Sequence, residues 1–128
     1  MQDPKLFKIN EKDKEHYRLL IKNIDISKRD SIISILGIKI QKILDRNKLN
    51  NLEVGLIDDM SKLIKILQLY SKLPDRIVKK ILFAMSYFID ENDDIPDVIP
   101  DYGYLDDIAV ARWIIDDIDK EIPELSKA

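Results

Sequence analysis

Apolar residues recur at intervals of three and four along almost the whole chain, and this spacing limits most strongly what the chain can fold into. A period near 3.6 aligns the apolar side chains of a segment on one face of an α-helix, whereas a half-buried strand needs strict alternation. Alternating segments are few, and β-hairpin turns are missing. The sequence therefore predicts an all-α protein without a sheet.

The spacing predicts five helices, and local signals place their ends. Ser27 and Asp30 have the spacing of a capping box and are expected to open the second helix. Pro74 suits the first position of the fourth. We expect a compact bundle of about five helices in a single domain, residues 1–128, with a proline-rich acidic loop between helices four and five. The predicted helices are roughly residues 11–25, 27–46, 52–70, 74–89 and 104–122.

Composition excludes several classes of protein. The 128 residues include no cysteine and one histidine, His16, which excludes disulfides, zinc–thiolate sites, cysteine nucleophiles and multi-histidine metal sites. The longest nearly apolar run, residues 32–38, is far shorter than the ~20 residues that span a bilayer. The N-terminal residues do not resemble a signal peptide. We expect a cytoplasmic protein without a transmembrane segment, and leave peripheral membrane contact and homo-oligomerisation open.

Charge is distributed unevenly along the chain. Residues 1–89 carry 18 Lys/Arg against 11 Asp/Glu, and residues 90–128 carry 3 against 13, within a net charge of −3. Between Asp90 and Asp107 there are eight acids and no base. This asymmetry indicates either a partner-binding face or two parts that neutralise each other, and the second interpretation is favoured. Scattered bases and a pI of 5.2 argue against nucleic-acid binding.

The segment that follows the predicted fourth helix is rich in proline as well as acid. Pro96 and Pro100 fix φ and are expected to hold Ile95 and Ile99 extended against the core. Arg76, Lys79 and Lys80 on the fourth helix are expected to form a solvated face, and they are the nearest bases before this segment in sequence. Trp113 is expected in core or interface packing, and Asp58 and Asp59 at the surface.

Residues 87–107, YFIDENDDIPDVIPDYGYLDD, carry many residue types at fixed spacing. They resemble the YkvA-like family, a bacterial and archaeal helical domain of unknown function, whose pattern is Y-x-x-x-P-x-D-x-I-P-D-x-x-P-x-x-G-x-x-D-D. Glu91 stands where the pattern has its first proline. The resemblance extends over roughly residues 74–120 and leaves residues 1–70 without an assignment. It implies a helical fold and no agreed activity. The matching positions are Tyr87, Asp93, Ile95, Pro96, Asp97, Pro100, Gly103, Asp106 and Asp107.

Four of these acids are the candidate site residues: Asp93, Asp97, Asp106 and Asp107. In one interpretation each acts alone, as a cap, in an Asx turn, or in the first turn of the fifth helix, where the macrodipole favours acids. In the other they converge. Two carboxylates ~4 Å apart repel by ~4 kcal/mol at an effective dielectric of 20, so convergence requires a cation or a basic partner. Without His or Cys, such a site selects Mg²⁺, Ca²⁺ or Mn²⁺.

Three functions remain open at this stage. The favoured one is a non-catalytic helical module whose acidic Pro/Asp loop binds a partner or a divalent cation. The second is a Mg²⁺-dependent hydrolase or transferase using the Asp cluster, although no nucleophile, base other than carboxylate, or glycine-rich phosphate loop is visible. The third is an acidic immunity or inhibitor-type protein that covers a basic site on a protein partner. We identify no catalytic residue, and expect that the chain is not an enzyme.

Overall fold

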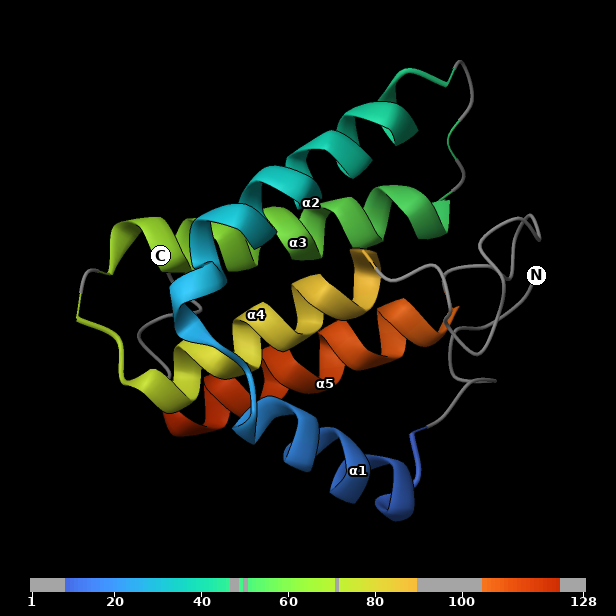
Figure 1. Ribbon diagram of the computed structural model, residues 1–128. Helices are drawn as coiled ribbons and strands as arrows, with labels where there is room; N and C mark the ends of the chain where they lie inside the picture. The colour runs from blue at the N-terminus through green and yellow to red at the C-terminus, as the bar shows by residue number, and fades with distance from the viewer. Residues whose placement is uncertain (1–8, 47–48, 50, 71, 90–104, 123–128) are drawn as a thin grey trace.

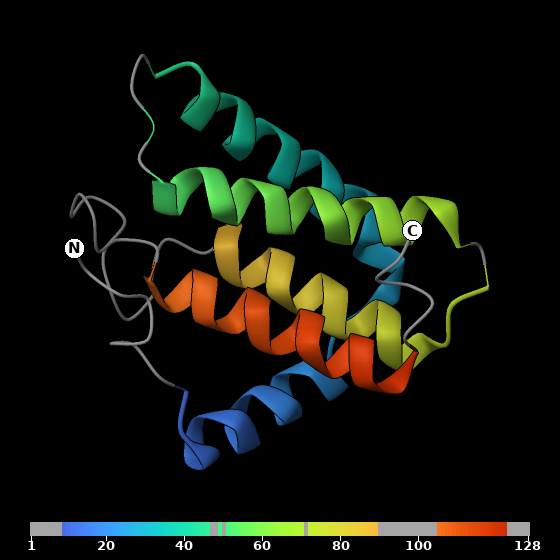
Figure 2. The same cartoon turned by 180° about the vertical axis from the view of Figure 1, so that it is seen from behind.

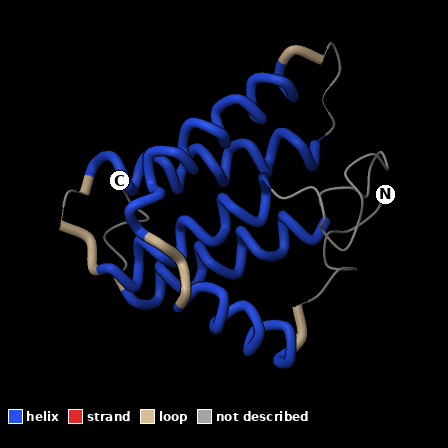
Figure 3. Tube along the Cα trace, in the orientation of Figure 1, coloured by secondary structure: helices blue, strands red, loops and turns tan. Residues whose placement is uncertain are grey.

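The computed structural model describes residues 9–46, 49, 51–70, 72–89 and 105–122, with the side chains of Leu105 and Asp106 excepted. These residues form five α-helices, one short 3-10 helix and no strand, which confirms the predicted all-α bundle (Figures 1 and 3). The elements are α1 (Glu11–Lys22), η2 (Ile26–Lys28), α2 (Arg29–Leu44), α3 (Asn51–Leu69), α4 (Asp75–Ile89) and α5 (Leu105–Glu121).

Helix α4 lies at the centre of the bundle and contacts α1, α2, α3 and α5. It runs antiparallel to α5, and the two lie side by side in both views (Figures 1 and 2). A helix that packs on several neighbours must be apolar on several sides. The buried residues of α4 accordingly surround most of its axis: Ile77, Val78, Ile81, Leu82, Phe83, Ala84, Met85 and Phe88.

Capping at the N-terminal end of the bundle differs from the prediction. The capping box belongs to α1, where Asn10 Oδ1 accepts a hydrogen bond from the backbone N–H of Asp13 at 2.7 Å, and the Asp13 carboxylate accepts one from the backbone N–H of Asn10 at 3.4 Å. The capping box predicted at Ser27 is wrong, because Ser27 lies inside η2. There, Asp25 Oδ1 accepts hydrogen bonds from both the backbone N–H and the hydroxyl of Ser27. Helix α2 then begins without a side-chain cap.

Aromatic side chains fix α1 against α4 and α5. The ring of Tyr17 lies 5.5 Å from Phe83, 5.7 Å from Tyr87 and 6.0 Å from Trp113, measured between ring centroids. The Tyr17 and Tyr87 hydroxyls are 3.5 Å apart. Such ring contacts add to the apolar area that the rings bury. Trp113 therefore packs between helices, as predicted, and Tyr87 holds α1 in place.

Helix α2 shows where apolar spacing alone does not predict burial. Leu36 and Ile43 are buried against the rest of the bundle, but Ile35 and Ile38 are 48% and 58% exposed. Apolar residues lie on several sides of α2 and do not define one face. The contact of α2 with α4 therefore decides which side is covered. Among the described residues, no helix combines the length and apolar character needed to cross a membrane.

Candidate functional site

The structure describes one side chain of the four predicted metal ligands. Asp93 and Asp97 lie outside the described residues, as do Pro96, Pro100, Ile95 and Ile99, whose predicted roles are therefore untested. Asp106 is placed in the first turn of α5, without its side chain. Within the described residues, no group of three or more His, Asp or Glu is placed to hold a metal ion. The convergence of the four acids stays a prediction.

Asp107 is the third residue of α5 and is only 2% exposed. Ile108, Val110 and Ala111, which follow it, are buried in the core. Burying a carboxylate is costly, and the positive end of a helix macrodipole offsets part of that cost in the first turn. The predicted position of Asp107 in the first turn is thus confirmed, and its burial is an additional finding.

A base from α2 lies near the end of α4, where the acidic segment begins. The Lys39 ammonium donates a hydrogen bond to the carbonyl oxygen of Phe88 and lies 4.7 Å from the centroid of the Phe88 ring. This contact satisfies one of the last carbonyls of α4, which have no partner within the helix. Because α4 and α5 are antiparallel, Lys39 and Asp107 belong to the same end of this helix pair.

Bases of α4 and acids of α5 pair at the opposite end of the two helices. Arg76 contacts Glu121 at 2.5 Å, and Lys80 contacts Asp117 at 2.6 Å and Glu121 at 3.3 Å. Hydrogen bonding to Arg76, aided by Lys80, lowers the pKa of Glu121. Burial alone would lower the pKa of Lys80, but Asp117 and Glu121 together outweigh it and raise that pKa.

These pairs agree with the interpretation that the basic and acidic parts of the chain neutralise each other. Arg76 is 62% exposed, as a solvated face requires, whereas Lys80 is 20% exposed and partly covered by its acidic partners. A further pair joins Arg112 of α5 to Asp59 of α3 at 2.8 Å. Asp58 is exposed, as predicted, and Asp59 is partly covered in this pair, with 16% of its side chain exposed.

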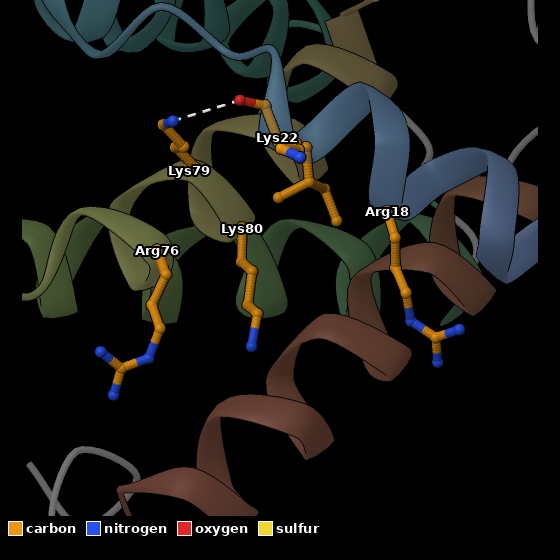
Figure 4. Close-up of a pocket in the computed structure, with 6 residues that line it drawn as sticks. Arg18, Lys22, Arg76, Lys79 and Lys80 are labelled. Carbon is orange, nitrogen blue, oxygen red and sulfur yellow. Dashed lines mark hydrogen bonds between the residues drawn. The ribbon is translucent and has the colours of Figure 1, made fainter.

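A second candidate site lies between α1 and α4. A cavity of about 320 Å³ is lined there by Arg18, Ile21, Lys22, Arg76, Lys79 and Lys80, and we call these six residues the basic groove (Figure 4). Lys79 donates a hydrogen bond to the backbone carbonyl of Lys22 at 3.1 Å. Sequence analysis missed this site. The available signal was a pair of bases four residues apart on each of two helices, Arg18 with Lys22 and Arg76 with Lys80.

Comparison with protein families matches residues 78–113 to a protein of unknown function, DUF1232. The match covers most of α4, the acidic segment and the first half of α5, including Asp107 and Trp113. Comparison with curated proteins and with solved structures found no match. The chain is thus similar, over this part, to a family without a described function.

Proposed function

We propose that the chain is a non-catalytic helical module, one domain over residues 1–128, whose acidic segment, residues 90–107, binds a divalent cation or a basic partner protein. The observation that carries the proposal is the burial of Asp107, which is 2% exposed at the end of a run of eight acids without a base. A carboxylate removed from water attracts a cation more strongly than an exposed one does, because the local dielectric is lower.

The placement of the bases supports this proposal. Arg76 and Lys80 precede the acidic segment on α4, but they pair with Glu121 and Asp117 at the far end of α4 and α5. Lys39 of α2 donates a hydrogen bond to the Phe88 carbonyl near the end of α4, directly before the acidic segment in sequence. The acidic segment carries eight acids and no base of its own, a composition that favours a cation or a positively charged partner.

We also infer that the family match and the YkvA-like resemblance describe one and the same family. The resembling positions lie between Tyr87 and Asp107, and all of them fall inside the matched residues 78–113. Tyr87 contacts Tyr17 of α1, so the matched region also positions a helix outside it.

A thermal-shift experiment with Mg²⁺, Ca²⁺ and Mn²⁺ tests the cation form of the proposal. A bound ion should raise the melting temperature, with a stabilisation of RT ln(1 + [L]/Kd), or about 2.7 kcal/mol at a hundredfold excess over Kd. Asp97→Asn and Asp107→Asn should each remove that response, because an amide can still cap a helix but is a poorer ligand. Asp116→Asn, on an exposed position of α5, is the matched control and should keep it.

The partner form is tested with a lysine-rich peptide as the probe. The double variant Asp97→Asn/Asp107→Asn should weaken binding more than Asp116→Asn/Asp119→Asn, which removes the same charge elsewhere on the acidic half. Equal weakening by both double variants would mean that net charge alone attracts the peptide. That result, together with melting temperatures that no ion changes, would refute the proposal and leave the acids as helix caps.

A further inference from the structure

Helix α2 lies at one edge of the bundle in both views, and it packs on the other α-helices mainly through α4 (Figures 1 and 2). Leu36 and Ile43 are buried on the side of α2 that is turned to the core. Another side of the helix carries six exposed residues, which begin at its N-cap and end at its C-cap. We call these residues the α2 seam: Lys28, Ser31, Ile35, Ile38, Lys42 and Asp45.

The α2 seam has the spacing of a coiled-coil contact. Its residues follow one another at alternating intervals of three and four, as positions a and d of a heptad do. Their side chains therefore share one stripe along the helix. Ile35 and Ile38 are at the centre of this stripe and are 48% and 58% exposed. The stripe thus has an apolar centre and polar ends, and it lies open to a second helix.

We propose that a second copy of this chain covers the α2 seam, with the two α2 helices antiparallel about a twofold axis that passes between Ile35 and Ile38. The intervals of the seam read the same in both directions, so reversal of the helix places each seam residue opposite another seam residue. Ile35 then meets Ile38 of the second copy, and a twofold axis forms the same contact a second time. This dimer is independent of the acidic segment.

Charge selects the antiparallel orientation over a parallel one. In the antiparallel pair, Lys28 lies opposite Asp45 of the second copy, and this attractive contact occurs twice. Parallel helices in register would instead set Lys28, Lys42 and Asp45 each against its own copy, which gives three repulsive contacts. Asp45 Oδ1 accepts a hydrogen bond from Gln41 at 2.9 Å, and its carboxylate has further lone pairs for an ammonium.

The size of the seam predicts a weak complex. Six residues of each copy take part, whereas a standard interface has about 20–30 residues a side. We therefore expect a dimer that exchanges with the monomer and forms at high protein concentration. A membrane surface fits this side of α2 less well, because an interfacial helix presents a broad apolar face and the seam has two isoleucines between polar residues.

Sedimentation equilibrium of the full chain, from about 10 μM to about 1 mM, measures this association. Lys28→Glu and Asp45→Lys should each raise the dissociation constant at least about fivefold, because each makes both attractive contacts repulsive. The double variant Lys28→Glu/Asp45→Lys restores opposite charges and should associate as the parent does. The single variants change the net charge from −3 to −5 and to −1, so weakening in both excludes an effect of net charge.

The apolar centre of the seam is tested with Ile35→Gln/Ile38→Gln, which should abolish the dimer. The matched control is Val54→Gln/Leu69→Gln on α3, where the two side chains are 44% and 61% exposed. This control should associate as the parent does. Circular dichroism and melting temperature check that each variant is folded.

The absence of cysteine from the chain permits a direct test of the register. Ile35→Cys and Ile38→Cys chains are mixed in equal amounts and oxidised. The antiparallel pair places these two positions opposite each other, so the mixed disulfide should be the main product. A parallel pair would give the two homodisulfides, and their predominance would overturn the proposed arrangement.

The proposal is overturned if the folded parent stays monomeric over the whole concentration range. Binding of such a monomer to vesicles of phosphatidylcholine and phosphatidylglycerol, lost in Ile35→Gln/Ile38→Gln, would assign this side of α2 to a membrane surface instead. Failure of Lys28→Glu/Asp45→Lys to restore association would also overturn the proposal, as would equal weakening by the α3 control.

Discussion

Replacement of Glu121 by glutamine removes one negative charge from the contact between α4 and α5. Glu121 accepts from Arg76 at 2.5 Å and from Lys80 at 3.3 Å, so one substitution weakens two ion pairs. Glutamine keeps the length of the side chain and one acceptor oxygen, which confines the change to charge. Lys80 keeps its contact with Asp117 in the variant.

The exposure of Arg76 and Lys80 sets the expected loss of stability in Glu121→Gln. Arg76 is 62% exposed, so water screens its pair with Glu121, and exposed pairs contribute about 0.2–1 kcal/mol. Lys80 and Glu121 are 20% and 28% exposed, and their pair is screened less. We therefore expect Glu121→Gln to lower the free energy of unfolding by about 0.5–1.5 kcal/mol at low salt. The loss should shrink in ~0.5 M NaCl, where the Debye length is only a few ångströms.

The contribution of Glu121 to the free energy of unfolding changes with pH in a definite direction. The pKa of Glu121 is lowered in the folded protein, chiefly by the hydrogen bond from Arg76. A carboxyl of this kind stabilises the fold fully above its unfolded pKa, about 4.3 for Glu, and the contribution disappears as the pH falls through the lower folded pKa. The difference between the parent and Glu121→Gln should therefore be constant near neutrality and vanish in acid.

Urea unfolding followed by circular dichroism measures these differences. Asp116→Asn, an exposed carboxyl on the same helix, is the control and should change stability by no more than about 0.5 kcal/mol. If Glu121→Gln costs no more than Asp116→Asn at low salt, or if its cost is the same at neutral and acid pH, the ion pairs between α4 and α5 do not stabilise the fold as argued.

Three further substitutions test the core, a cap and the untested segment. Leu63→Ala should lower the free energy of unfolding in urea by about 2–5 kcal/mol, because Leu63 is fully buried. Leu69→Ala, at a residue 61% exposed in the same helix, should lower it by less than about 0.5 kcal/mol. Similar losses in the two variants would contradict the assigned core. Asn10→Ala should lose about 1 kcal/mol by removing the α1 cap, and an unchanged melting temperature would show that the capping box is not formed. Replacement of Pro96 and Pro100 by alanine should lower the melting temperature, at about 0.4–1 kcal/mol per proline, and a double variant that melts with the parent would exclude a rigid segment.

The positions of the helices follow from the sequence to within a few residues, and their ends follow less well. Apolar periodicity is local, since residues three and four apart share a face whatever the rest of the chain does. Helix α1 nevertheless ends at Lys22 rather than near residue 25, and its Leu20 is 42% exposed although the neighbouring Ile21 is buried. The helix does not continue to Asp25, because the chain turns there through η2, which contacts α4. The Asp25 side chain accepts a hydrogen bond from Ser27 in this turn.

The candidate sites, too, depend partly on local sequence and partly on tertiary packing. The sequence alone determined that the described part of the chain is helical, that α5 begins with acids, and that bases and acids are segregated, because these properties depend on residue type and local spacing. Only the tertiary structure decided that Asp107 is buried, that Arg76 and Lys80 engage the end of α5, and that residues of α1 and α4 line one groove. Spacing within a helix fixes which side chains share a face, but the packing of one helix on another fixes what that face meets.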